Sequence, residues 1–143
     1  METALNMAKY ILNKCTVEKH MISNLQLQKI MYIIQREFLK KFHFAMIDCY
    51  FEAWRYGPVI PEVYVRYCGS GSSKINRIYD VELAGPTKKY ISKIDLIIET
   101  KRESNPWDLV DETHNPGGAW DITYANGLGD RKIIKNELIE SAG

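Results

Sequence analysis

Apolar residues spaced three or four positions apart predict helices along most of the chain. The clearest pattern lies in the N-terminal third, where the apolar positions are Leu27, Ile30, Met31, Ile34 and Phe38. Ser23 followed three residues later by Gln26 has the form of a capping box, and Ile22 before it is placed to act as a hydrophobic staple. We therefore predict a helix that starts at Ser23, runs to about Lys41 and buries this apolar face in the core.

Weaker apolar patterns, each preceded by a start signal, predict further helices. One is capped by Thr3 and ends near Cys15–Val17, one begins at Pro61, one begins at Pro86 or Thr87, and a short one follows Asn105-Pro106 through Asp111. In the helix that begins at Pro61, the expected buried positions are Val63, Tyr64 and Tyr67. In the helix that begins at Pro86 or Thr87, they are Tyr90, Ile91, Ile94, Ile97 and Ile98. Asn136 is placed to cap a last helical turn at Glu137–Glu140.

The other regular elements are expected to be short and extended. Residues 49–56 lack a helical period and alternate as a short strand does, and Lys132–Ile134 is a second candidate strand. Gly57-Pro58 predicts a turn between regular elements, Gly69–Ser73 a flexible linker, and residues 125–131 a turn-rich segment of hairpin type. The sequence thus predicts a mainly α protein, a compact single-domain helical fold over residues 1–143 with a minor short β component.

Length and charge narrow the class of protein further. The chain has 143 residues, enough for one domain, and 19 basic against 18 acidic residues give a net charge of +1. This balance argues against a generic nucleic-acid or membrane-surface binder, whose affinity needs many uncompensated cations. No apolar run approaches the roughly 20 residues of a membrane span, and Met1–Lys9 lacks the layout of a signal peptide. Three widely spaced cysteines indicate reduced thiols in a cytoplasmic protein.

No pattern of residues points to catalysis, a cofactor or a metal. His20, His43 and His114 stand apart, and no cysteine lies within four residues of a histidine. Asp111 and Glu112 lie close to His114, but a histidine at a helix end is more often paired with a backbone carbonyl or an acid than with a metal. The glycines after residue 68 lack the Gly-Lys-Ser/Thr of a phosphate loop. We therefore expect no catalytic residues, no cofactor-binding residues, no metal ligands and no enzymatic activity.

Aromatic residues are concentrated around the Gly57-Pro58 turn. Six of them fall within eighteen residues: Tyr50, Phe51, Trp54, Tyr56, Tyr64 and Tyr67. Aromatic side chains on a rigid turn are typical of a protein-binding hot spot, although they can equally pack onto the preceding helix. The candidate partner-binding residues are Trp54, Arg55, Tyr56, Gly57, Pro58 and Tyr64; we expect Trp54 to be mainly structural and Tyr56 to be the better interface residue.

Two blocks of sequence carry a family resemblance. Residues 22–32, with Leu27, Lys29 and Tyr32, resemble the Leu-Gln-Lys helix of the Panacea domain, the SocA-like antitoxin domain also found in phage-associated GepA proteins. Residues 52–64, with Gly57-Pro58 at their centre, resemble the second conserved block of that family. A weaker third similarity involves Trp107, Thr113-His114 and Trp120.

The resemblance implies a mainly helical, non-enzymatic antitoxin that neutralises a co-encoded toxin by direct binding. The alternative is an adaptor that delivers a partner to protease machinery or acts in a phage-associated complex. Leu27, Lys29, Tyr32 and His114 are then structural motif residues of the scaffold. Lys29 stands one position off the apolar stripe, where we expect it to contact an aromatic ring or an acid in a cation–π or ion-pair interaction.

Overall fold

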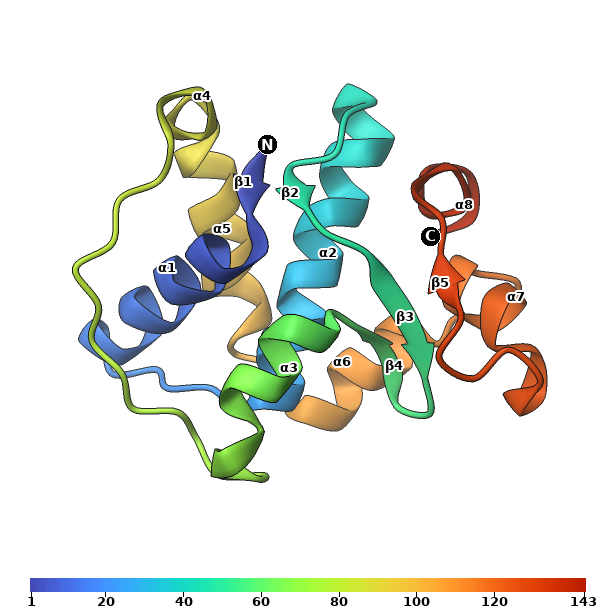
Figure 1. Ribbon diagram of the computed structural model, residues 1–143. Coiled ribbons are helices and arrows are strands. Elements are labelled where there is room, and N and C mark those ends of the chain that lie inside the picture. Colours follow the sequence, from blue (N-terminus) through green and yellow to red (C-terminus); the bar gives the residue numbers. More distant parts are fainter.

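One long helix, α2 (Asn24–Phe42), runs through the middle of the computed structural model, which describes residues 1–143 (Figure 1). The capping box is confirmed, because the Ser23 hydroxyl accepts a hydrogen bond from the Gln26 amide and the Gln26 side chain accepts one from the Ser23 amide. The expected apolar face is also confirmed: Leu27, Ile30, Met31, Ile34 and Phe38 are fully buried. Helix α2 buries residues on nearly every side, as a central core helix does.

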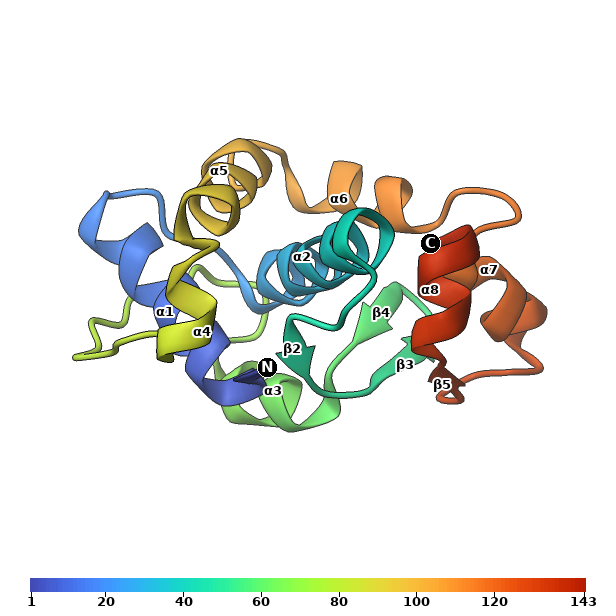
Figure 2. The same cartoon turned by 90° about the horizontal axis from the view of Figure 1, so that it is seen from above.

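Seven further helices surround α2. They are α1 (Ala4–Val17), α3 (Pro61–Tyr67), α4 (Gly85–Lys88), α5 (Ile91–Lys101), α6 (Pro106–Thr113), α7 (Ala119–Tyr124) and α8 (Asn136–Ala142). Seen from above, α5 and α6 cover one side of α2, and α3 and the small strands cover the other (Figure 2). The fold is thus mainly helical, as the sequence predicts. None of the helices combines the length and the apolar content needed to cross a bilayer.

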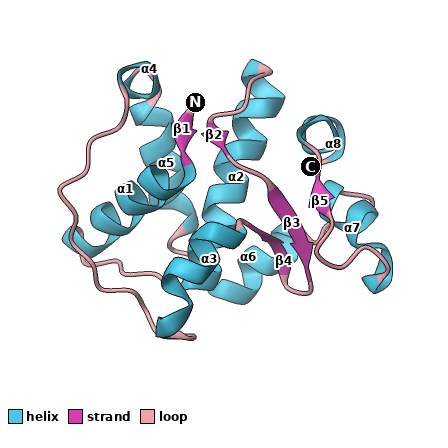
Figure 3. Cartoon of the chain, in the orientation of Figure 1, coloured by secondary structure: helices cyan, strands magenta, loops and turns pink.

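The strands are short (Figure 3), and seen from above they lie on the same side of α2 as α3 (Figure 2). β1 (Glu2–Thr3) pairs in parallel with β2 (Ile47–Asp48), while β3 (Phe51–Trp54) lies between β4 (Gly57–Val59) and β5 (Ile133–Ile134) in an antiparallel sheet. The two expected strands are confirmed as β3 and β5. The inner face of this sheet packs on α2, where the Phe51 ring meets the buried Tyr32 ring edge-on at 5.2 Å.

Several boundaries differ from the sequence prediction. The single helix expected after Pro86 is divided into α4 and α5, because Tyr90 leaves helical geometry and packs edge-on against Phe38. Asn136 lies inside α8, whose N-cap is Lys135, and the side chain of Tyr64 points outward with 37% exposure. Helix α7 was not expected, and a short 3₁₀ helix (Ala125–Gly127) followed by turns replaces the expected hairpin.

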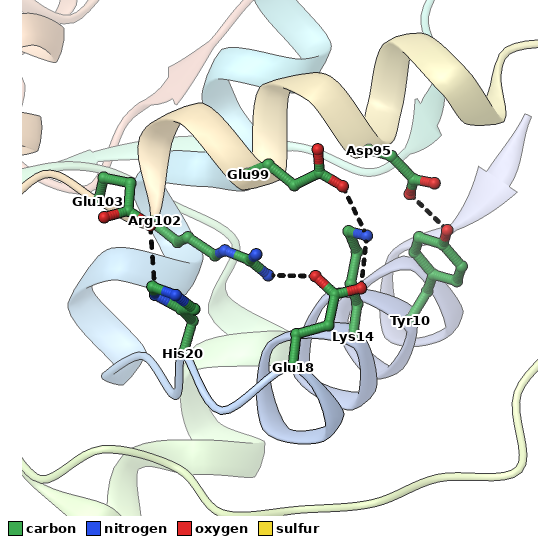
Figure 4. Close-up of polar contacts among 8 residues, drawn as sticks. All are labelled: Tyr10, Lys14, Glu18, His20, Asp95, Glu99, Arg102 and Glu103. Carbon is green, nitrogen blue, oxygen red and sulfur yellow. Dashed lines mark hydrogen bonds and ion pairs between the residues drawn. The ribbon is translucent and has the colours of Figure 1, made fainter.

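Polar contacts hold α1 against α5 (Figure 4). The Lys14 ammonium lies 2.8 Å from a carboxylate oxygen of both Glu18 and Glu99, and Arg102 reaches Glu18 at 2.8 Å. Tyr10 donates a hydrogen bond to Asp95 at the other end of this seam. Because the carboxylates are 40% exposed or more, each pair adds little stability, and the pairs serve mainly to align the two helices.

The segment between α3 and α4 begins with a short 3₁₀ helix (Cys68–Ser70) and then has no helix or strand. Residues 71–84 run along the outside of α1 as an extended loop (Figure 3). Two side chains of α1 fix this loop by accepting hydrogen bonds from its backbone: Asn13 accepts from the Tyr79 amide at 2.9 Å and Thr16 from the Arg77 amide at 3.3 Å. At its start the Ile75 amide also donates a hydrogen bond to the Ile22 carbonyl at 2.7 Å. The absence of a clear period in the sequence at 74–86 therefore reflects a loop that is held by scattered hydrogen bonds and not by a regular element.

Candidate functional site

The β3–β4 hairpin presents the aromatic residues singled out in the sequence. Trp54 pairs with Gly57, so the two residues of the turn are Arg55 and Tyr56, and Gly57-Pro58 already belong to β4. The expected turn at Gly57-Pro58 is thus displaced by two residues. Pro58 is tolerated in a strand here because β4 lies at the edge of the sheet, where a missing N–H breaks no ladder.

Gly57 is required by both its backbone geometry and its surroundings. Its φ of +113° lies in a region that residues with a side chain rarely adopt. A Cβ at this position would also lie 2.8 Å from Cε of Lys29 and 3.0 Å from the Thr113 hydroxyl. The start of β4 is therefore pressed against α2 and α6 with no room for a side chain.

Lys29 is the most unusual residue of the site. Its side chain is fully buried, and its ammonium donates a hydrogen bond to the carbonyl of Pro58 at 2.9 Å. The expected cation–π or ion-pair contact is absent, because no acid and no aromatic ring pairs with this ammonium. Burial without a counter-charge lowers the pKa of Lys29 to about 7.

Two glutamines of α2, like Lys29, form hydrogen bonds with the backbone of neighbouring segments. Gln28 accepts a hydrogen bond from the Ile60 amide at 2.9 Å, immediately after β4. Gln35 accepts from the Ile47 amide at 2.8 Å and donates to the Ile47 carbonyl at 2.9 Å. Both side chains are fully buried. Side chains of α2 therefore hold the segments around β2 and β4 through hydrogen bonds to their backbone. The sequence did not predict this role. Its signal is a polar residue that stands inside an otherwise apolar helical stripe.

His114 and Trp120, which belong to the third and weakest block of family resemblance, pack behind the hairpin. Trp120 donates a hydrogen bond from its indole to the Trp54 carbonyl at 2.7 Å, and its ring stacks on the His114 ring at 3.6 Å. Burial first, and the nearby charge of Lys29 second, lower the pKa of His114, which keeps it neutral at pH 7. No three metal-ligating side chains of the chain come together, at His114 or elsewhere.

Beside the turn lies a cavity of about 210 Å³. It is lined by Leu25, Lys29, Trp54, Arg55, Tyr56, Val59, Tyr64, Asp130 and Arg131. The rings of Trp54 and Tyr64 meet edge-on at 4.9 Å, and the Arg131 guanidinium lies 4.0 Å from the centre of the Trp54 ring. The cavity thus brings together seven residues from the two sequence blocks that carry the resemblance, with Asp130 and Arg131 added from the segment before β5.

A second aromatic pair extends this surface toward α6. The rings of Tyr56 and Trp107 meet edge-on at 5.4 Å, and the two residues are 47% and 57% exposed. Trp107 was not among the candidate partner-binding residues, because it follows Tyr56 by 51 positions and only the fold brings α6 next to the turn. Partly exposed aromatic side chains grouped in this way are typical of protein-binding surfaces.

Comparison with known proteins gives a family and one relative. A family model described as "Antitoxin SocA-like, Panacea domain" matches residues 27–121, from α2 into α7. Antitoxin SocA of Caulobacter vibrioides (strain NA1000 / CB15N) is 37% identical over 68 residues, which cover 48% of this chain and 36% of that protein. The similarity therefore spans about a third of the relative's length. No solved structure matches this chain.

Proposed function

This chain belongs to the SocA-like Panacea antitoxin family, and from that membership we propose that it neutralises a co-encoded toxin protein by direct binding, without catalysis. The observation that carries the proposal is the match over residues 27–121, which includes most of α2, the β3–β4 hairpin and α6. These are the elements that form the aromatic surface around the turn.

The geometry of the hairpin supports a binding role. Tyr56 and Trp107 expose about half of their surface, although burying aromatic rings is favourable. Behind them the chain is rigid, because the Lys29 ammonium and the Trp120 indole both donate hydrogen bonds to the hairpin backbone. A surface that is ordered before binding loses little entropy on association, so its contacts contribute more to affinity.

Toxicity rescue tests the proposal. The open reading frame next to the gene for this chain would be expressed from an inducible promoter, with and without this chain, and growth would be measured. We expect growth arrest by the neighbouring protein alone and rescue by this chain, together with a complex that co-purifies. A neighbouring frame without toxicity, or toxicity that this chain does not relieve, would contradict the proposal.

Single substitutions locate the binding surface in the same assay. Tyr56→Ala is expected to fold normally and to lose about 2 kcal/mol or more of binding free energy, roughly thirtyfold in Kd. Tyr50→Ala is the matched control, since Tyr50 is 73% exposed but lies at the other end of β3 from the turn. Full rescue by folded Tyr56→Ala would remove this residue from the interface. Toxin loss that depends on a cellular protease would instead indicate the adaptor role.

A further inference from the structure

The cavity beside the turn is lined by more cationic than anionic side chains. Three of its lining residues are cations, Lys29, Arg55 and Arg131, against the single carboxylate of Asp130. None of these four residues takes part in any ion pair of the structure. By contrast, Lys14 and Arg102, along the seam between α1 and α5, each lie 2.8 Å from a carboxylate oxygen (Figure 4). The cavity is therefore electrostatically suited to an anionic group.

The size of the cavity limits what that group can be. A volume of about 210 Å³ holds about seven water molecules at roughly 30 Å³ each. Sites for cofactors and other small molecules of that class usually measure about 300–1,000 Å³. The space therefore suits one protein side chain better than a nucleotide or an organic cofactor.

The walls of the cavity strengthen the attraction for such a group. Trp54 and Tyr64 supply aromatic surface, and Arg131 is held over the Trp54 ring at 4.0 Å. Lys29 also lines the cavity, although it is fully buried, and only one of its three N–H donors has an acceptor, the Pro58 carbonyl. Because this ammonium is buried, water screens its charge only weakly.

We propose that this cavity receives the carboxylate of an aspartate or glutamate side chain from the protein partner. The step rests on the proposed toxin binding. Arg55 and Arg131, both exposed, attract the carboxylate at the rim, and buried Lys29 favours it inside. Because the pKa of Lys29 is about 7, a bound carboxylate also draws a proton onto this amine. Of the other groups beside Lys29, His114 is neutral at pH 7, and Asp130, Arg55 and Arg131 are the charged residues that share the cavity.

Nuclear magnetic resonance of the whole chain tests the proposal without the toxin. The probe is glutamate blocked as N-acetyl-glutamate methylamide, whose only charge is the side-chain carboxylate, with chloride at equal ionic strength as the blank. We expect a saturable shift of the Trp54 indole N–H signal with the probe and none with chloride. N-acetyl-alanine, which carries only a C-terminal carboxylate, is expected to bind more weakly. No saturable shift, or tighter binding of N-acetyl-alanine, would overturn the assignment to an acidic side chain.

Matched variants show whether the cavity itself binds the probe. Arg131→Gln is expected to weaken binding of the blocked glutamate about two- to fivefold, and Lys29→Met more than tenfold. Lys132→Gln removes a charge from the neighbouring exposed residue, which does not line the cavity, and is expected to leave binding unchanged. Equal loss in Arg131→Gln and Lys132→Gln would reduce the effect to general surface charge and overturn the proposal.

The rescue assay separates this inference from the proposed function. If the chain relieves toxicity but the blocked glutamate does not bind, the cavity inference fails and toxin neutralisation stands. If the probe binds at the cavity but the chain does not relieve the toxicity of the neighbouring protein, the proposed toxin neutralisation fails. The carboxylate site then stands, but a toxin does not supply the carboxylate. If Arg131→Gln weakens rescue and Lys132→Gln leaves it unchanged, the result supports both the toxin neutralisation and the carboxylate site.

Discussion

Replacing Lys29 with methionine measures the energetic consequence of burying an ammonium beside the hairpin. Methionine has a similar length and fills the same space with an apolar chain. The substitution has two opposing effects on the free energy of unfolding. It leaves the buried Pro58 carbonyl without its donor, at a cost of about 1–3 kcal/mol, and it removes the cost of burying a charge.

The second effect can be worked out from the pKa of Lys29. Burial lowers this pKa from 10.5 to about 7, and at ~1.4 kcal/mol for each pKa unit the buried ammonium costs about 5 kcal/mol. Below pH 7 both states are protonated and the full cost is present. Between pH 7 and 10.5 the unfolded chain binds more protons than the folded protein, so stability rises with pH. From pH 7 to pH 9 the wild-type protein should therefore gain about 2 kcal/mol relative to Lys29→Met.

Urea unfolding at pH 7, 8 and 9 tests this expectation. The quantity to follow is the difference in unfolding free energy between wild type and Lys29→Met, because groups common to both proteins cancel. His114, the titratable neighbour of Lys29, is already neutral in this range. Lys132→Met, at an exposed lysine, is the control and is expected to show no such trend. A difference that stays constant from pH 7 to pH 9 would refute the argument that Lys29 is buried without a counter-charge.

Two further substitutions test the scaffold by urea unfolding. Gly57→Ala is expected to lower the free energy of unfolding by about 1–3 kcal/mol or more, since alanine is strained at a φ of +113° and its Cβ would meet Lys29. A loss below about 0.5 kcal/mol would mean that β4 does not press on α2. Ile34→Ala is expected to lose about 2–5 kcal/mol because the residue is fully buried in α2, whereas Leu96→Ala, at a position that is 64% exposed, should change stability by less than about 0.5 kcal/mol.

The candidate residues of the hairpin show where reasoning from the sequence succeeded and where it could not. The Gly-Pro pair pointed to a turn in the correct part of the chain, because a hairpin with a glycine of positive φ leaves a local signature. The exact turn was displaced by two residues, since pairing with β3 extends through Gly57. Lys29 was assigned the wrong contact because its partner is a backbone carbonyl, which no side-chain pattern reveals.

By itself the sequence determined the features that depend on residues within about one helical turn of each other. The Ser23–Gln26 capping box, the apolar face of α2 and the proline-initiated α3 and α6 are of this kind, and so is the family resemblance carried by contiguous blocks. Their interactions span three or four positions, so the spacing of residue types is sufficient to predict them.

Only the tertiary structure decided which distant residues come together at the candidate site. Trp107 reaches Tyr56, and Arg131 reaches the Trp54 ring, across 51 and 77 positions of sequence. Whether such residues meet depends on how α6 and the segment before β5 pack around the hairpin, and the same local patterns are compatible with many packings. The cavity, its unpaired positive charge and the lowered pKa of Lys29 arise from that packing, because burial and the distance between charges are properties of the folded chain alone.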